Sequence, residues 1–350
     1  MIIEDRHKFD RNYVAIITPF KKDNLEIDYD AFRKHIHWFL DDPEFHKLKG
    51  SFIVNPEAAE MFYFSREARN KLIDIMMEET KGYDMPIFAG VFAVTIEDAI
   101  TCALDAKERG VTGLFVFPPT GTMEVSTALD NVHYPEVWTR WLKAIDDAAD
   151  MPIIIHPAAP FSNEWGQSLP ANTIQMMLDN IPNIVGYKVI NGIDAACFKT
   201  ARFFRAYPRH VAILNGGNLS WLSAEMCGLV DGSVQGSWNW DKEAYYQVAA
   251  AKEHNDLAEL SKVLSTAVLP LWEYVYAGGT RIHVRYKLAA WIRGVIPHPF
   301  MLPPMGPPHR EEAETLYRLI RNSGMSCIDE ETFESVLARQ DEILATYHKQ

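Results

Sequence analysis

The sequence is dominated by eight short apolar runs, rich in β-branched residues, that are separated by segments with helical periodicity. The runs are apolar throughout, as expected of parallel strands whose sheet is covered on both faces. They lie at 13–20, 48–56, 85–92, 111–119, 151–157, 183–190, 210–217 and 229–238. The segment 95–110 shows the helical spacing and ends on Gly110, a residue that favours a helix C-terminus. Eight such units predict an α/β fold, a (β/α)8 TIM barrel.

The main alternative, a doubly wound open sheet, is disfavoured because no G-x-G-x-x-G motif follows the first run to bind a dinucleotide. The strand pattern stops near residue 240. The rest of the chain has helical periodicity, interrupted by the proline-rich connector 297–310. We therefore predict a barrel domain at 1–240 and a C-terminal helical extension at 241–350.

Charge and cysteine usage narrow the class of protein. The 350 residues carry a formal net charge of -13, which argues against nucleic acid or an anionic membrane as a partner. No apolar run approaches the ~18 residues of a membrane-spanning helix, and the charged first twelve residues do not resemble a signal peptide. The four cysteines are far apart and form no C-x-x-C. Reduced thiols and a cytoplasmic location are expected.

One charged residue, Lys188, interrupts the apolar run 183–190. Burying an amine is costly unless it is paired or loses its proton, and full burial lowers a lysine pKa by up to about 3–5 units. A neutral amine attacks carbonyl carbons to form a Schiff base, and catalytic groups of such barrels lie at the C-terminal strand ends. The alternative is a lysine with a buried stem whose ammonium reaches water or a carboxylate. The strand alone leaves both interpretations open.

A resemblance to a known family favours the catalytic interpretation. It is carried by ITPF (17–20), AEMFYFSREAR (59–69), GYK (186–188), MCGLVDGSVQGSWN (226–239) and PPMGPPHREEAETLYRLI (303–320). In the order and spacing of these stretches, from about Tyr13 to Met325, the chain resembles the dihydrodipicolinate synthase / N-acetylneuraminate lyase family of Schiff-base aldolases and dehydratases. The resemblance implies that Lys188 forms the imine with a 2-oxo acid such as pyruvate. It also implies that no metal or organic cofactor is needed and that the protein is a homo-oligomer, a tetramer or a dimer.

The stretch after the second run departs from this family. The family has Gly-Thr-Thr-Gly-Glu or a close variant, whereas residues 56–60 read PEAAE, so both hydroxyls are missing. We predict that the loop with Glu57, Ala58 and Ala59 binds the substrate carboxylate through backbone N–H groups. Glu57 either repels that carboxylate or acts as an acid or base. Glu60, which matches the family's glutamate, is expected to be structural.

The fifth run differs as well. The family usually has Tyr-Asn there, and the tyrosine passes protons near the imine, but this chain has His156 at or next to that position. Histidine is suited to acid–base work because its unperturbed pKa is about 6.5; the alternative is a ring satisfied by local hydrogen bonds. The segment 158–167 lacks the Gly-Arg that the synthase subfamily uses for its aldehyde partner, which argues against lysine biosynthesis.

Three further residues are candidates for substrate binding. Thr120, or its neighbour Thr122, follows the fourth run and is either a hydrogen-bond donor to substrate or a turn residue. Asn215, with Asn218, follows the seventh run and either contacts substrate or shapes the turn and caps the next helix. Trp238 ends the eighth run and forms either an apolar wall of the site or part of the core.

No other motif competes with the lysine. The 12 histidines include no H-E-x-x-H and no H-x-H with carboxylates at metal-ligand spacing, so no metal site is predicted. The chain also lacks G-x-S-x-G and a P-loop.

Together these observations predict a Schiff-base-forming lyase that acts on a small 2-oxo acid through Lys188, with His156 moving protons. Within this chemistry an aldolase, a hydratase-aldolase and a sugar-acid dehydratase remain open. The alternative is a barrel that kept the fold but lost turnover and now binds a ligand or regulates. The altered loop at Glu57 and Ala58 and the histidine at position 156 motivate it.

Overall fold

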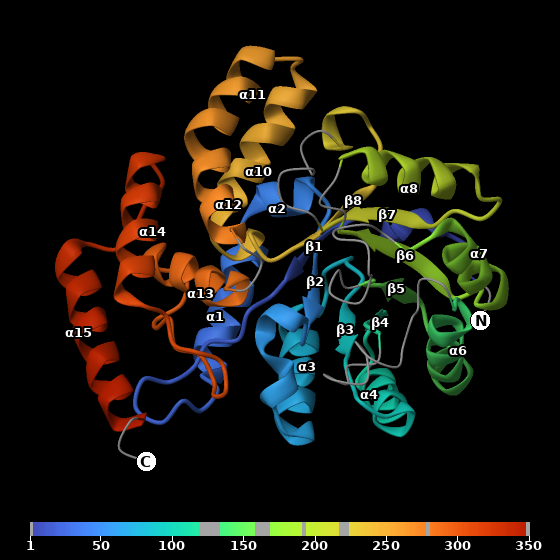
Figure 1. Cartoon of the computed structure of the whole chain (residues 1–350), viewed down its shortest axis with the longest axis horizontal. Coiled ribbons are helices and arrows are strands. Elements are labelled where there is room, and N and C mark those ends of the chain that lie inside the picture. Colours follow the sequence, from blue (N-terminus) through green and yellow to red (C-terminus); the bar gives the residue numbers. More distant parts are fainter. Residues whose placement is uncertain are drawn as a thin grey trace. The chain divides into compact units, whose positions relative to one another are not determined.

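The computed structural model describes residues 3–118, 134–157, 169–190, 194–216, 224–277 and 281–347. Within them, parallel strands close into a barrel that follows the order of the sequence (Figure 1). The strands are β1 (Asn12–Ala15), β2 (Gly50–Val54), β3 (Phe88–Val91), β4 (Gly113–Val116), β5 (Ile153–Ile155), β6 (Ile184–Val189), β7 (Ala212–Asn215) and β8 (Gly232–Gln235). Helices alternate with these strands and more helices follow β8, so the predicted (β/α)8 barrel with a C-terminal helical extension is confirmed.

The chain forms two compact units, which are described separately. The first contains every strand of the barrel and consists of Met1–Ile16, Phe45–Glu57 and Phe64–Gln235. The second consists of Ile17–Glu44, Ala58–Tyr63 and Gly236–Gln350. The short helices α2 (Pro43–Lys47) and η2 (Glu57–Ala59) lie where the chain passes from one unit to the other.

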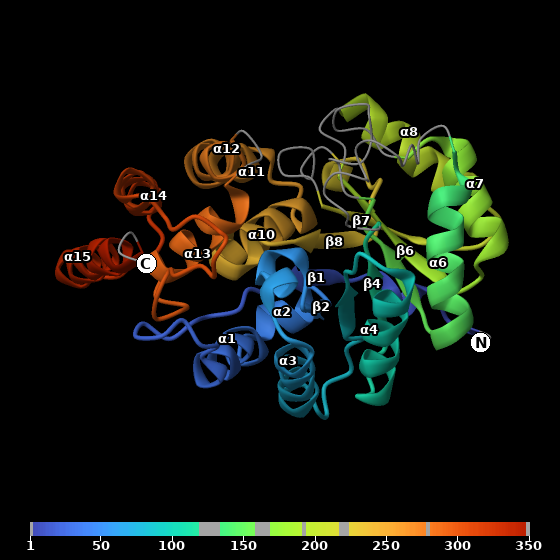
Figure 2. The same ribbon diagram turned by 60° about the horizontal axis from the view of Figure 1, so that its bottom comes forward.

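In the first unit, helices lie on the outside of the strands (Figure 2). They are α3 (Arg66–Glu79), α4 (Ile96–Glu108), α6 (Glu136–Ala149), α7 (Ala171–Asn180) and α8 (Asp194–Ala206). Hydroxyl caps set two of their N-termini: Ser65 accepts the N–H of Ala68 in α3, and Thr95 accepts that of Asp98 in α4. Gly110, at φ +80°, follows the C-terminus of α4, as the sequence predicted.

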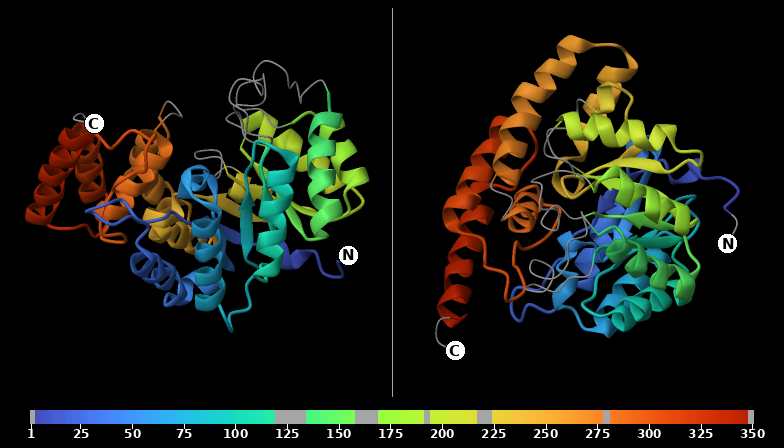
Figure 3. Two further views of the ribbon diagram at one scale, coloured as in Figure 1. Left: turned by 90° about the horizontal axis from the view of Figure 1, so that it is seen from below. Right: turned by 45° about the vertical axis from the view of Figure 1, so that its right-hand side comes forward.

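In the second unit, most of the described chain is helical. Its helices are α1 (Tyr29–Leu40), α10 (Trp238–Glu253), α11 (Leu257–Val263), the π-helical η5 (Leu264–Val268), α12 (Leu269–Tyr276), α13 (Ile282–Ile292), α14 (Arg310–Asn322) and α15 (Glu330–Tyr347), with the 3-10 turn η3 (Met61–Tyr63). Figure 3 shows α14 and α15 side by side, where the rings of Tyr317 and Phe333 stack at 4.3 Å. No helix in the described ranges is both long and apolar enough to cross a lipid bilayer.

A buried ion pair lies at the centre of the second unit. Lys287 on α13 and Glu60 are 0% and 1% exposed and form an ion pair. Lys287 also donates to the carbonyl of Phe300 at 3.0 Å and lies 3.7 Å from the ring centroid of Phe20. Glu60 accepts the N–H of Leu302 at 2.7 Å. The pair therefore ties the turn at Glu60 to α13, as expected for a structural glutamate.

Replacing one partner of this pair tests its contribution to stability. Lys287→Met leaves the Glu60 carboxylate buried without its counter-charge, so we expect the free energy of unfolding to fall by about 3–5 kcal/mol. Urea unfolding followed by circular dichroism measures this change.

The exposed pair of Lys262 and Glu259, 3.1 Å apart, is the matched control. Lys262→Met should change stability by less than about 1 kcal/mol. The double variant Glu60→Gln/Lys287→Met should recover some of the loss, because no buried charge remains unpaired. Equal effects at the buried and exposed pairs would contradict this account.

Candidate active site

Adjacent strands bring Lys188 and His156 together. In the register between β5 and β6, Ile155 pairs with Tyr187, which places the next residues, His156 and Lys188, opposite each other. The ring of Tyr187 packs on that of Phe204 in α8 at 4.8 Å, so Tyr187 points outward and Lys188 points into the barrel. The Lys188 Nζ lies 3.0 Å from the His156 Nε2.

A glycine on the next strand makes room for the lysine side chain. A Cβ at Gly216, directly after β7, would lie 2.1 Å from the Lys188 Cε, closer than any real contact. Gly186, two residues before Lys188 on the same strand, leaves room instead for Ile154 and Leu214, which a Cβ there would meet at 3.0 and 3.2 Å. The stem of Lys188 is therefore confined between its neighbours, which fixes the direction of the amine.

Burial changes the acidity of this amine. Desolvation lowers the pKa of Lys188 to about 8, and the negative charge of Glu57 opposes some of that shift. The amine lies 5.8 Å from the ring centroid of Phe115, within the apolar interior of the barrel. About a tenth of Lys188 is thus neutral, and hence nucleophilic, at pH 7, far more than for an ordinary lysine with its pKa of about 10.4.

Glu57 is the third member of the cluster. Its Oε2 lies 3.5 Å from the His156 Nε2, the nitrogen that also faces Lys188, and its side chain is 41% exposed. Asn55 sets the turn that leads to it. Asn55 has φ +52° and donates from Nδ2 to the carbonyl of Arg69 in α3 at 3.0 Å. The same imidazole nitrogen therefore contacts both the amine and the carboxylate, and the carboxylate is the partly exposed member of the cluster.

Phe117 packs on the imidazole and Phe92 packs on Phe117; neither residue was predicted from the sequence. The Phe117 ring centroid lies 4.0 Å from that of His156, and Phe92 lies 3.6 Å from Phe117 on the far side. The carbonyl of Phe117 accepts the indole N–H of Trp141 at 2.8 Å. The available signal was positional, because Phe92 and Phe117 directly follow β3 and β4 as His156 follows β5.

Two other predicted site residues, Asn215 and Thr120, are not placed beside Lys188 by the structure. Asn215 pairs with Val189 in the sheet, and Lys188 pairs with Leu214, so Asn215 lies on the opposite face of the strand from Lys188. It is buried and accepts from the Gln235 Nε2 at 3.4 Å. Thr120 lies outside the described residues.

The remaining candidates belong to the second unit. Ala58 and Ala59 directly follow Glu57 in η2 and are buried. Trp238 begins α10, is fully buried, and stacks on Tyr245 at 3.9 Å between ring centroids. Their predicted contribution to substrate binding stays a prediction.

A sequence comparison connects this geometry with known proteins. The sequence model of the dihydrodipicolinate synthetase family matches residues 8–323. The chain belongs to this family. It is 31% identical over 188 residues to the 4-hydroxy-tetrahydrodipicolinate synthase of Rhodospirillum centenum, a match that covers 53% of this chain and 56% of that protein. It is 24% identical to an uncharacterized DapA-like lyase of Thermofilum pendens, over 88% of this chain and 95% of the relative.

Solved structures of the family share the fold. Dihydrodipicolinate synthase from Aquifex aeolicus superimposes with a TM-score of 0.75 at 18% identity, covering 92% of this chain and 100% of that one. A monomeric dihydrodipicolinate synthase variant gives 0.76 at 19% identity, over 93% and 100% of the two chains. The chain spans 56% and 63% of the length of two curated relatives that it matches, and the identities of 31% and 27% show that it is a divergent family member.

The shifted pKa of Lys188 gives a direct test of the site. Below about pH 8 the ammonium form of Lys188 dominates, and it does not react with an acylating reagent. Above about pH 8 the neutral amine dominates and reacts. We expect labelling of Lys188, followed by peptide mass spectrometry, to rise with an inflection near pH 8. The exposed Lys262 serves as the internal reference.

Glu57→Gln sharpens this test, because Glu57 favours the ammonium form of Lys188. Removing its charge should move the inflection to lower pH. An inflection that stays in place, or moves upward, would show that Glu57 does not act on this amine.

Proposed function

We propose that this protein is a Schiff-base-forming lyase that acts on a 2-oxo acid such as pyruvate through Lys188. The observation that carries the proposal is the contact of 3.0 Å between the Lys188 amine and the His156 imidazole, with Glu57 beside them. Family membership supports the same chemistry. Turnover by this chemistry distinguishes the proposal from a barrel that only binds or regulates.

In the proposed reaction, the neutral amine of Lys188 attacks the C2 carbonyl carbon of the 2-oxo acid. The amine nitrogen loses a proton as the carbinolamine forms, and the His156 Nε2 is close enough to accept it. The alkoxide oxygen formed by the attack takes one proton from solvent and becomes the carbinolamine hydroxyl. The imidazolium then returns its proton to this hydroxyl, which leaves as water. The product is a protonated imine, which withdraws electrons from the adjacent carbon.

Glu57, which contacts the same nitrogen, supports this proton transfer. An ionised Glu57 stabilises the imidazolium of His156 across 3.5 Å, and its exposed carboxylate can exchange the proton with water. The pair thus performs the task of the hydroxyl groups that the loop 56–60 lacks. Backbone N–H groups of the loop 57–59 are proposed to hold the substrate carboxylate.

The proposal is limited to a 2-oxo acid lyase and does not extend to lysine biosynthesis. Several relatives are named 4-hydroxy-tetrahydrodipicolinate synthase. However, the segment 158–167 lacks the Gly-Arg pair of that subfamily. A different aldehyde acceptor or leaving group is therefore proposed, and a cytoplasmic homo-oligomer stays a prediction.

Trapping of the imine tests the central step. Incubation with pyruvate and borohydride should add one reduced pyruvyl group per chain, measured as intact mass, and Lys188→Ala should abolish the addition. Peptide mapping provides a matched control within the same molecule. Lys287 has its pKa lowered by burial to a similar value, about 8, but is enclosed by Glu60 and Phe300. Absence of an adduct with every 2-oxo acid tested would falsify the proposal.

Proton exchange at C3 of pyruvate tests the role of His156. An imine that loses a C3 proton becomes an enamine, so the enzyme in D2O should replace the methyl protons of pyruvate with deuterium, as measured by proton NMR. His156→Phe keeps the ring packing but removes the base, and we expect the exchange rate to fall by about 10²–10⁴-fold.

Borohydride trapping shows whether His156→Phe is still folded, because a folded variant should form the trapped adduct on long incubation even when its exchange rate is low. A pH–rate profile of exchange that is unchanged in His156→Phe would exclude an acid–base role. Adduct formation without exchange in the unmodified protein would favour the repurposed barrel.

A further inference from the structure

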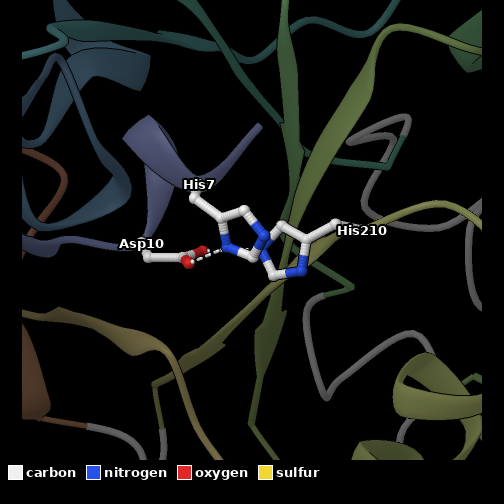
Figure 4. Close-up of side chains that lie close together, drawn as sticks. All are labelled: His7, Asp10 and His210. Carbon is white, nitrogen blue, oxygen red and sulfur yellow. Dashed lines mark hydrogen bonds and ion pairs between the residues drawn. The ribbon is translucent and has the colours of Figure 1, made fainter. Parts of the chain in front are cut away.

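A second cluster of ionisable side chains lies at the N-terminal end of the barrel strands. His7 and Asp10 precede β1, and His210 precedes β7. Asp10 accepts from both imidazoles through different oxygens: Oδ2 lies 2.9 Å from the His7 Nδ1, and Oδ1 lies 2.8 Å from the His210 Nε2. The two rings stack with centroids 3.9 Å apart and an interplanar angle of 28° (Figure 4).

The cluster is held in place by the surrounding backbone. The N–H of Asp10 donates to the carbonyl of His7 at 3.0 Å, so these side chains project from one turn. Phe9 between them is fully buried. The Arg6 guanidinium donates to the carbonyls of Pro182 and Ile184 at 2.6 and 2.9 Å, which fixes this segment against the start of β6.

The donor set has the composition and spacing of a metal site. Two imidazoles and one carboxylate, with ligand atoms within 4.8 Å of one another, offer three ligands to one ion. A Zn²⁺ ion at its usual bond lengths of about 2.0–2.2 Å holds its ligand atoms about 3.3 Å apart. The two imidazoles contact different oxygens of Asp10, at 2.9 and 2.8 Å, so the carboxylate binds the ion through both oxygens or rotates to offer one of them. Neutral histidines need only exchange tautomers, moving each N–H to the other ring nitrogen.

Two neighbouring cations are engaged with backbone carbonyls. Arg209, next to His210, donates to the carbonyls of Leu178 and Ile181 at 2.9 and 3.2 Å. Arg11 donates to the carbonyl of Lys8 at 3.2 Å. The side chain of His7 is 72% exposed, which gives an ion a path to the cluster and leaves a position for water.

We propose that His7, Asp10 and His210 bind a divalent transition-metal ion such as Zn²⁺, which cross-links the segment before β1 to the segment before β7. His210 is 200 residues from Asp10, and β8 lies between β1 and β7 in the barrel. The ion therefore joins the segments that precede β1 and β7, the two strands on either side of β8. A link between such distant residues stabilises the fold by restricting the unfolded chain.

Metal binding by the full chain tests this site. After removal of metal with EDTA, equilibrium dialysis against micromolar Zn²⁺ should give one ion per chain. His7→Gln and His210→Gln should each weaken binding at least tenfold. Co²⁺ should give the visible absorption bands of tetrahedral coordination in the unmodified protein and lose them in His210→Gln.

The control is His37→Gln, which removes another histidine that faces an aspartate, Asp41, at 3.2 Å. It should bind Zn²⁺ as the unmodified protein does. At about 100 times the dissociation constant, Zn²⁺ should also raise the melting temperature of the unmodified protein by about 3–5 °C, and not that of His210→Gln.

No binding by the unmodified protein would overturn the proposal. Equal binding by His210→Gln, as expected for Zn²⁺ on a cysteine, would overturn it as well. Loss of stability in the histidine variants without any effect of Zn²⁺ would assign the cluster a purely hydrogen-bonding role. Imine trapping at Lys188 should be independent of Zn²⁺, so this test and that of the proposed function fail independently.

Discussion

The desolvation of one amine inside a closed barrel is the constraint on which the site depends. Lys188 sits on a strand whose neighbours are apolar, and the barrel surrounds its stem so closely that only glycine fits at position 216. That confinement lowers the pKa of the amine and also directs it at His156, 3.0 Å away. The packing of the strand thus affects both the pKa and the direction of the amine, and the charge of Glu57 acts on the pKa in addition.

The chain contains a second lysine whose pKa is lowered by burial, and the comparison shows how the surroundings of the two amines differ. Burial lowers the pKa of both Lys188 and Lys287 to about 8. Lys287 is fully enclosed, with Glu60 as an ion-pair partner and a backbone carbonyl as acceptor. Lys188 instead faces an imidazole, and the nearest carboxylate, Glu57, is partly exposed. A lowered pKa alone does not identify a nucleophile; the nature of its partners does.

The barrel and its lysine follow from sequence because they depend on local patterns. Apolar runs predict buried parallel strands, and a charge within such a run is conspicuous at 188. The details of the site depend on register, which the pattern leaves open. Register decides that Asn215 faces away from Lys188 and that Phe117 packs on His156. The cluster at His7 escapes any motif search because its third member, His210, is distant in the chain and joins it only through barrel closure.

In the proposed reaction, a relay through His156 and Glu57 in place of hydroxyl groups would change the electrostatics of imine formation. Hydroxyl groups pass protons without carrying charge, whereas this pair alternates between neutral and ionic forms. The ionic form is favoured just when a proton leaves Lys188, because the imidazolium then lies 3.5 Å from an anionic Glu57. The same anion disfavours loss of the ammonium proton beforehand, since it raises the pKa of Lys188. Exposure of Glu57 weakens both effects through solvent screening.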